Sequence, residues 1–149
     1  MTEEKITKAV IGWLQENGWE IVCFDFPQSG TGRVLHPNAD VRENTKNKGG
    51  IIPDIVAVRG GIAVFFENKD RYLHSDFKKV QNLCSTNDYS DAIDALLSDH
   101  RIQSITYGVG GPDETTFIDR AFQSRDMIDF IVVTDGVTAK VVYDGHQSF

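Results

Sequence analysis

Three charged residues interrupt the most apolar part of the chain. Residues 51–69 read IIPDIVAVRGGIAVFFENK, with Asp54 near one end, Glu67 near the other and Lys69 two positions later. Two carboxylates that meet repel each other unless a proton or a cation lies between them. Carboxylate and phosphate oxygens suit Mg²⁺, and a bound metal assists hydrolysis at phosphorus. These residue types therefore suit phosphodiester hydrolysis, and a plain salt bridge between Lys69 and Glu67 is the alternative.

The glycine pair between the two apolar runs predicts that these charges meet. Gly60 and Gly61 suit a two-residue hairpin turn, which would place Asp54 opposite Glu67 on antiparallel strands. Directly opposed residues have Cβ atoms roughly 4.5–5.5 Å apart. Lys69 shares a face with Glu67 because strand side chains alternate with a period of two. The three charged groups are thus expected at one end of the hairpin.

The remaining elements are predicted from apolar periodicity and turn residues. A first helix is expected from a cap at Thr2 to a stop at Gly18, and further helices near residues 75–84, 90–98 and 113–124. Strands are expected over residues 19–26, 51–58, 62–67, 102–109, 128–134 and 139–143, the last two forming a C-terminal hairpin around Asp135-Gly136. Residues 27–50 form a long polar loop, and residues 1–149 form a single domain.

The motif and the element order together resemble a known enzyme family. "PD" at 53–54, twelve residues, then "ENK" at 67–69 looks like the PD-(D/E)xK nuclease superfamily. The resemblance covers residues 2–109 and implies an α/β fold with a restriction-endonuclease-like αβββαβ core. A mixed central sheet flanked by helices would then carry an extra C-terminal β-hairpin. It also implies that Asp54 and Glu67 are metal ligands and that Lys69 is the catalytic lysine.

Further residues from three other segments are candidates for this site. Many members of the superfamily add a glutamate from the first helix, for which Glu4 is the better choice and Glu3 the lesser, with helix capping as the alternative. "FPQSGTG" at 26–32 resembles a segment of archaeal Holliday-junction resolvases and nominates Ser29, although a turn serine is an equal reading. Lys78 and Gln81 share a helix face and could approach a phosphate, unless that face is simply solvated.

The long loop is the candidate DNA contact. It spans residues 27–50, and loops of such length without secondary structure are usually functional or disordered. Arginine and lysine suit guanine edges and phosphates. The expected contact residues are Arg33, His36, Arg42, Lys46 and Lys48.

Composition limits the class of protein. The net charge is −7, which argues against a generic, strongly basic nucleic-acid coat. Residues 31–79 nevertheless hold nine basic and six acidic residues, which is also compatible with ordinary surface scatter. Cys23 and Cys84 lack metal-type spacing and fit reduced core residues. No signal peptide or membrane-spanning run is evident, so a cytoplasmic location is expected.

The sequence thus predicts a Mg²⁺-dependent DNA endonuclease, in which Mn²⁺ would substitute for Mg²⁺. The nearest class is a small type II restriction endonuclease that cuts double-stranded DNA as a homodimer. One alternative is a structure-selective nuclease of the Holliday-junction resolvase type. Another is a catalytically silent nuclease fold that serves as a DNA-binding or assembly module.

Overall fold

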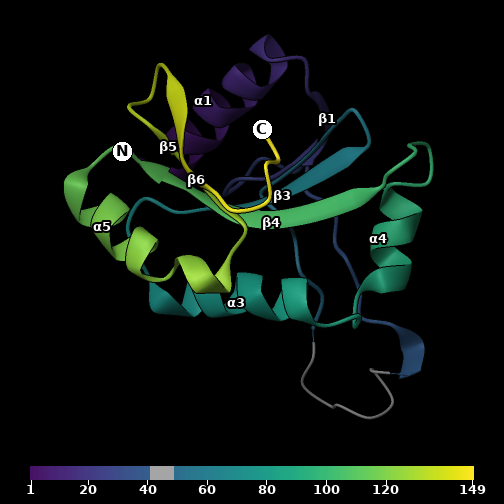
Figure 1. The fold of residues 1–149 in the computed structure, drawn as a ribbon. Coiled ribbons are helices and arrows are strands. Elements are labelled where there is room, and N and C mark those ends of the chain that lie inside the picture. Colours follow the sequence, from purple (N-terminus) through teal and green to yellow (C-terminus); the bar gives the residue numbers. More distant parts are fainter. Residues whose placement is uncertain (41–48) are drawn as a thin grey trace.

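A single mixed sheet organises the chain. The computed structural model describes residues 1–40 and 49–149, and six strands within them run in the order β1-β2-β3-β4-β5-β6 across the sheet (Figure 1). The strands are β1 (Glu20–Phe24), β2 (Ile55–Arg59), β3 (Ile62–Asn68), β4 (Ser104–Pro112), β5 (Phe130–Thr134) and β6 (Ala139–Asp144). The helices are α1 (Glu3–Glu16), α3 (His74–Ser85), α4 (Ser90–Leu96), α5 (Thr115–Gln123) and the short 3₁₀ helix η1 (Arg125–Met127). The expected α/β class, with a mixed sheet flanked by helices, is confirmed.

Helices cover both faces of the sheet. On one face α1 packs Ile6, Val10 and Leu14 against strand residues that include Phe66 and Phe130. On the other face, α3, α4 and α5 contribute apolar side chains to a second core (Figure 1). Alternate residues of β3 enter opposite cores because successive strand side chains point to opposite faces. The sheet therefore lies between two apolar layers, and β3 is buried on both sides.

Local signals account for α1. The Thr2 hydroxyl accepts a hydrogen bond from the Lys5 amide at 3.1 Å, which satisfies one of the free N–H groups of the first turn. Gly18 follows the last turn with a positive φ, in the left-handed region that glycine adopts at little cost. The predicted start and stop of this helix are therefore confirmed.

The central hairpin has the predicted register. Arg59 pairs with Ile62 and Val58 with Ala63, and the antiparallel ladder continues to Ile55 and Phe66. Both glycines between the strands have a positive φ, which allows the tight turn. Because of this register, the residues just before β2 lie beside the last residues of β3.

The segment before β2 differs from its prediction. Strand β2 begins at Ile55 rather than at residue 51, because Pro53 has no N–H to donate to a ladder. Ile51 instead forms an isolated antiparallel bridge with buried Leu35. Asn38 donates hydrogen bonds from its side chain to the Asn87 carbonyl and the Ser90 hydroxyl. The described parts of the long loop are thus tied to the body of the protein.

The C-terminal half completes the sheet. Strand β4 runs parallel to β3 and continues through Gly110, Gly111 and Pro112, beyond the predicted end at residue 109. Strand β5 runs parallel to β4, and β6 pairs antiparallel with β5, so the predicted C-terminal hairpin is part of the main sheet. Among the described residues, no helix has the length and apolar character needed to cross a membrane.

The two cysteines differ in exposure. Cys23 on β1 is a buried free thiol, as expected of a core residue. Cys84 on α3 is also free but exposed, and its Sγ lies 3.6 Å from Asp129 Oδ2. The prediction of a core position is therefore confirmed for Cys23 and wrong for Cys84.

Substitution of a glycine in the hairpin turn and of a glycine inside α1 should have opposite effects on stability. Gly61→Ala should lower the free energy of unfolding by ~1 kcal/mol or more, because an L-residue is strained at a positive φ. Gly12→Ala should raise it by up to ~1 kcal/mol, because Gly12 lies inside α1 with open space around its Cα. Urea unfolding followed by circular dichroism measures both. Equal effects of the same sign would contradict the assignment of the turn.

Candidate active site

Two carboxylates meet where β2 begins and β3 ends. The ladder stops at Ile55 and Phe66, and one residue earlier the Asp54 amide donates to the Phe66 carbonyl at 3.0 Å. The Asp54 carboxylate accepts the Asn68 amide at 2.7 Å, which fixes its position beside the end of β3. Glu67 lies between these two contacts along β3 and is 8% exposed. The hairpin therefore brings Asp54 beside Glu67, as its register predicted.

Burial and mutual repulsion perturb both acids. Desolvation, followed by the charge of Glu67, raises the pKa of Asp54 to about 8, although the Asn68 amide and nearby lysines oppose the shift. Burial also raises the pKa of Glu67, while the charge of Lys79 lowers it. The charged form of each acid is thus disfavoured in this position. A cation that enters between the two oxygen groups would relieve that cost.

Asn68 points to the opposite face, as strand alternation predicts. Its side-chain amide donates to the Thr7 hydroxyl on α1 at 3.1 Å, in a buried contact. Gly110 on β4 leaves room for the Asn68 amide, because a Cβ at that position would collide with the amide oxygen. This contact attaches the end of β3 to α1.

The ammonium group of Lys69 interacts with the carboxylates of Glu3 on α1 and Asp76 on α3. Its Nζ is 3.3 Å from Glu3 Oε1 at the N-terminus of α1. Burial lowers the pKa of Lys69, but the charges of Asp76 and Glu3 outweigh this and raise it overall. The structure therefore surrounds Lys69 with acids that keep it protonated.

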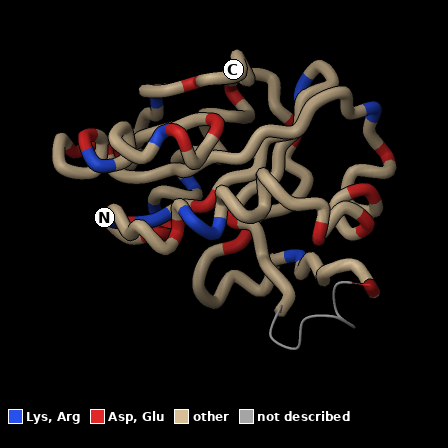
Figure 2. The backbone as a smooth tube through the Cα atoms, turned by 60° about the horizontal axis from the view of Figure 1, so that its bottom comes forward, with Lys and Arg blue, Asp and Glu red and all other residues tan. Residues whose placement is uncertain are grey.

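Helix α3 supplies the second lysine. Lys79 Nζ lies 3.2 Å from Glu67 Oε1, and one turn earlier Asp76 has a buried Oδ2 without a hydrogen-bond partner among the described residues. Burial raises the pKa of Asp76, and the charges of Lys69 and Lys79 lower it. Figure 2 shows acidic and basic positions from separate parts of the chain gathered near the N-terminus. The charged group therefore consists of Glu3, Asp54, Glu67, Lys69, Asp76 and Lys79.

Other sequence candidates lie outside this group of six. Glu4 is exposed and pairs with Lys8 at 3.5 Å, so the structure brings Glu3 rather than Glu4 to Lys69. The Ser29 hydroxyl donates to Asp25 Oδ1 at 3.0 Å within its own loop. Lys78 and Gln81 are exposed on α3.

Sequence reasoning passed over Asp76 and Lys79. A signal was available, because Asp76 and Lys79 are three residues apart and flank the apolar face of α3 that carries Phe77 and Val80. Lys78 lies on the far side of the helix from Val80. The residues that flank the buried face of α3 were therefore better candidates for the site than the residues on its exposed face.

The candidate DNA contacts divide into two groups. Arg33 and His36 are exposed, and Arg33 lines a hollow with Gln15 and Phe24 between α1 and β1. Arg42, Lys46 and Lys48 lie outside the described residues. The structure thus gives positions for two of these five side chains.

The oxygen donors fit a hard cation only in part. Asp54 and Glu67 supply carboxylate oxygens, the type of ligand that Mg²⁺ prefers. Within residues 1–40 and 49–149, no group of three or more histidine, cysteine, aspartate or glutamate side chains is placed to hold a metal ion. Mg²⁺ commonly retains several waters and takes only one or two protein carboxylates. The pair therefore fits a Mg²⁺ whose other ligands are water and substrate.

Comparisons with known proteins give a similarity in structure but none in sequence. No protein-family model and no curated protein sequence matches the chain. The chain is similar to the crystal structure of an fdxN element excision controlling factor protein from Anabaena variabilis. The two share 17% identity with a TM-score of 0.48, and the match covers 93% of this chain and 98% of that one.

The raised pKa of Asp54 predicts how stability depends on pH in EDTA. Its pKa is about 8 in the folded chain against an ordinary 3.8, so the folded state holds the proton more tightly than the unfolded state. The stability that this proton contributes is complete below pH 3.8 and is lost as the pH rises through about 8. Wild type should therefore lose stability over this range relative to Asp54→Asn. Urea unfolding at several pH values measures the difference.

An exposed aspartate provides the control for this measurement. Asp119→Asn on α5 removes the same charge from a solvent-exposed position, so its stability should follow wild type across the range. The burial of Asp54 would be contradicted if Asp54→Asn and Asp119→Asn gave parallel curves.

Proposed function

We propose that the protein is a Mg²⁺-dependent endonuclease of the PD-(D/E)xK type that hydrolyses phosphodiester bonds in DNA. The supporting observation is the meeting of Asp54 and Glu67 at adjoining strand ends, with two lysines in ion pairs around them. The order α1, β1, β2, β3, α3, α4, β4 resembles the αβββαβ core of that superfamily, with α4 as an additional helix. Mn²⁺ would substitute for Mg²⁺, because it also accepts carboxylate and water ligands.

In this proposal Asp54 and Glu67 hold the metal. A bound divalent cation would polarise a phosphate oxygen and lower the pKa of an attacking water. The Asn68 amide fixes the Asp54 carboxylate, and the Asn68 side chain anchors that strand end to Thr7. The ends of β2 and β3 are held by the apolar cores on both faces of the sheet. The two carboxylates are therefore fixed in position relative to each other, as electrostatic preorganisation requires.

Lys69 acts in this proposal as a cation rather than as a base. Asp76 and Glu3 raise its pKa, so it remains protonated at neutral pH. A protonated lysine can orient water and neutralise charge that grows on phosphorus, but it cannot accept a proton. Lys79, 47% exposed at its side chain, is a second cation that a phosphate could reach.

Cleavage of mixed DNA substrates tests the proposal. With Mg²⁺ the wild-type chain should cut, and Asp54→Ala and Lys69→Ala should each lose at least ~100-fold in rate, because each removes charge stabilisation at the reacting phosphate. Glu3→Ala should reduce the rate by releasing Lys69, whereas Glu4→Ala on the same helix turn should match wild type. Gel analysis and sequencing of product ends measure the effect. Undiminished cleavage by Asp54→Ala and Lys69→Ala would refute the site.

The choice of substrate separates the alternatives. Cutting a linear duplex at one sequence would support a restriction-type enzyme, whereas cutting only four-way junctions would support a resolvase. Ser29 was the sequence feature that favoured a resolvase, and its hydroxyl is engaged with Asp25 in its own loop. A chain that binds DNA but cuts no duplex, junction or single strand would be a non-catalytic module.

Cleavage of both strands by one site per chain would call for a homodimer. The edge strand β6 and the helix α5 are the candidate contacts. Phe122 on α5 is 42% exposed and packs edge-on against Tyr143 of β6, with ring centroids 6.1 Å apart. Sedimentation velocity, with and without DNA, measures the oligomeric state.

Metal binding provides a test that does not depend on the substrate. Mg²⁺ should raise the melting temperature of wild type, because a ligand that binds only the folded state stabilises it. Glu67→Gln should melt at the same temperature with and without Mg²⁺, since it loses a charged oxygen ligand. Glu4→Gln serves as the matched control and should respond as wild type does. Equal responses of Glu67→Gln and Glu4→Gln would contradict the assigned ligand.

A further inference from the structure

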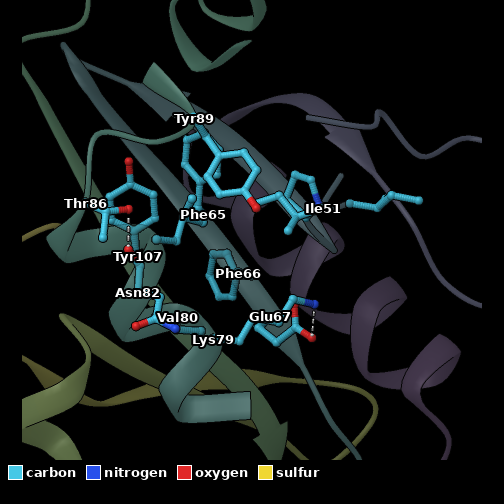
Figure 3. A pocket seen from close by; sticks show the side chains of 14 residues that line it. Ile51, Phe65, Phe66, Glu67, Lys79, Val80, Asn82, Thr86, Tyr89 and Tyr107 are labelled. Atoms are coloured by element: carbon cyan, nitrogen blue, oxygen red, sulfur yellow. Dashed lines mark hydrogen bonds and ion pairs between the residues drawn. The ribbon is translucent and has the colours of Figure 1, made fainter. Parts of the chain in front are cut away.

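A cavity opens directly beside the carboxylate pair. It has a volume of about 130 Å³ and lies between β3, α3 and residues 51–53 (Figure 3). Glu67 and Lys79 belong to its lining and also to the charged group. The cavity and the proposed active site are therefore continuous.

Aromatic side chains form part of the walls of this cavity. Phe65, Tyr89 and Tyr107 line it and are at most 8% exposed, and the rings of Phe65 and Tyr107 lie 5.2 Å apart. Figure 3 shows the rings of Phe65, Tyr89 and Tyr107 together at one end, with Glu67 and Lys79 at the other. The Tyr89 hydroxyl donates to the Gly49 carbonyl at 3.0 Å, which holds that ring in place. The cavity thus offers flat apolar surfaces next to a charged mouth.

Polar groups lie at one margin. Asn82 and Thr86, both exposed, line the cavity from the last turn of α3. The Thr86 hydroxyl donates to the Asn82 backbone carbonyl at 2.8 Å, and the exposed side-chain amide of Asn82 lies at the margin of the cavity. An amide both donates and accepts hydrogen bonds, as the edge of a nucleobase does.

We propose that this cavity binds the unstacked base of a nucleotide adjacent to the scissile phosphate. The inference rests on the proposed function, because it places the phosphate of that nucleotide at Asp54, Glu67 and Lys79. Aromatic side chains stabilise a base that has left the stack. A flat ring with a polar edge matches the aromatic walls and the Asn82 amide. A positively charged Lys79 at the mouth complements the attached phosphate.

The volume favours a pyrimidine. An apolar cavity of about 150 Å³ admits a single six-membered ring such as benzene. The present cavity is similar, at about 130 Å³, and therefore suits thymine or cytosine better than the fused rings of a purine.

Titration of the metal-free, ¹⁵N-labelled chain with mononucleotides tests the inference. TMP and dCMP should shift the assigned amide signals of Phe65 and Tyr107, and should bind at least about fivefold more tightly than 2-deoxyribose 5-phosphate, which has no base. dGMP should bind more weakly than TMP. Leu83→Trp, which places a large ring in the cavity from α3, should abolish the base-dependent part of the affinity. Ser85→Trp on the exposed face of the same helix should leave it unchanged.

The outcomes separate this inference from the proposed function. Equal binding of TMP and 2-deoxyribose 5-phosphate would overturn it, even if the chain cuts DNA. The inference would also fail if a folded Leu83→Trp chain bound TMP as wild type does. If Leu83→Trp did not fold, the wild-type comparison of TMP with the sugar phosphate would still decide. Base-dependent binding without any cleavage would support the cavity as a nucleotide site and refute only the nuclease proposal.

Discussion

The site depends on holding two carboxyl groups side by side at the edge of an apolar core. Asp54 and Glu67 lie where β2 and β3 adjoin, and burial disfavours the charged form of both. Such a pair persists only because the surrounding structure fixes it, since separate carboxylates in water would move apart. The turn at Gly60-Gly61 and the ladder up to Ile55 and Phe66 provide that constraint.

The ion pairs show how the two helical layers meet at this point. Glu3 reaches Lys69 from α1, and Lys79 reaches Glu67 from α3, so elements on opposite faces of the sheet contribute to one charged group. Asn68 adds a buried hydrogen bond to Thr7 on α1. Each charge near the carboxylates is therefore positioned by an element whose apolar side belongs to a core.

The neighbouring cavity joins the charged group at Glu67 and Lys79. It extends from Glu67 and Lys79 toward Phe65, Tyr89 and Tyr107. The charged end of this surface matches the phosphate of a nucleotide, and the aromatic end matches its base. The segment at residues 51–53 forms part of the wall because Pro53 keeps it out of the ladder and Ile51 pairs with Leu35.

The sequence by itself determined the hairpin, its register and the position of Asp54 beside Glu67 at adjoining strand ends. These follow from local rules, namely a glycine turn and the period of two along a strand. It also determined the α/β class and the order of most elements from apolar periodicity. Only the tertiary structure decided which charges from distant elements join the site. The sequence favoured Glu4 over Glu3, but the packing of α1 on the sheet places Glu3 beside Lys69 and leaves Glu4 paired with Lys8. The contact of α3 with the sheet likewise selected Asp76 and Lys79 over Lys78 and Gln81, because helix orientation depends on the whole core.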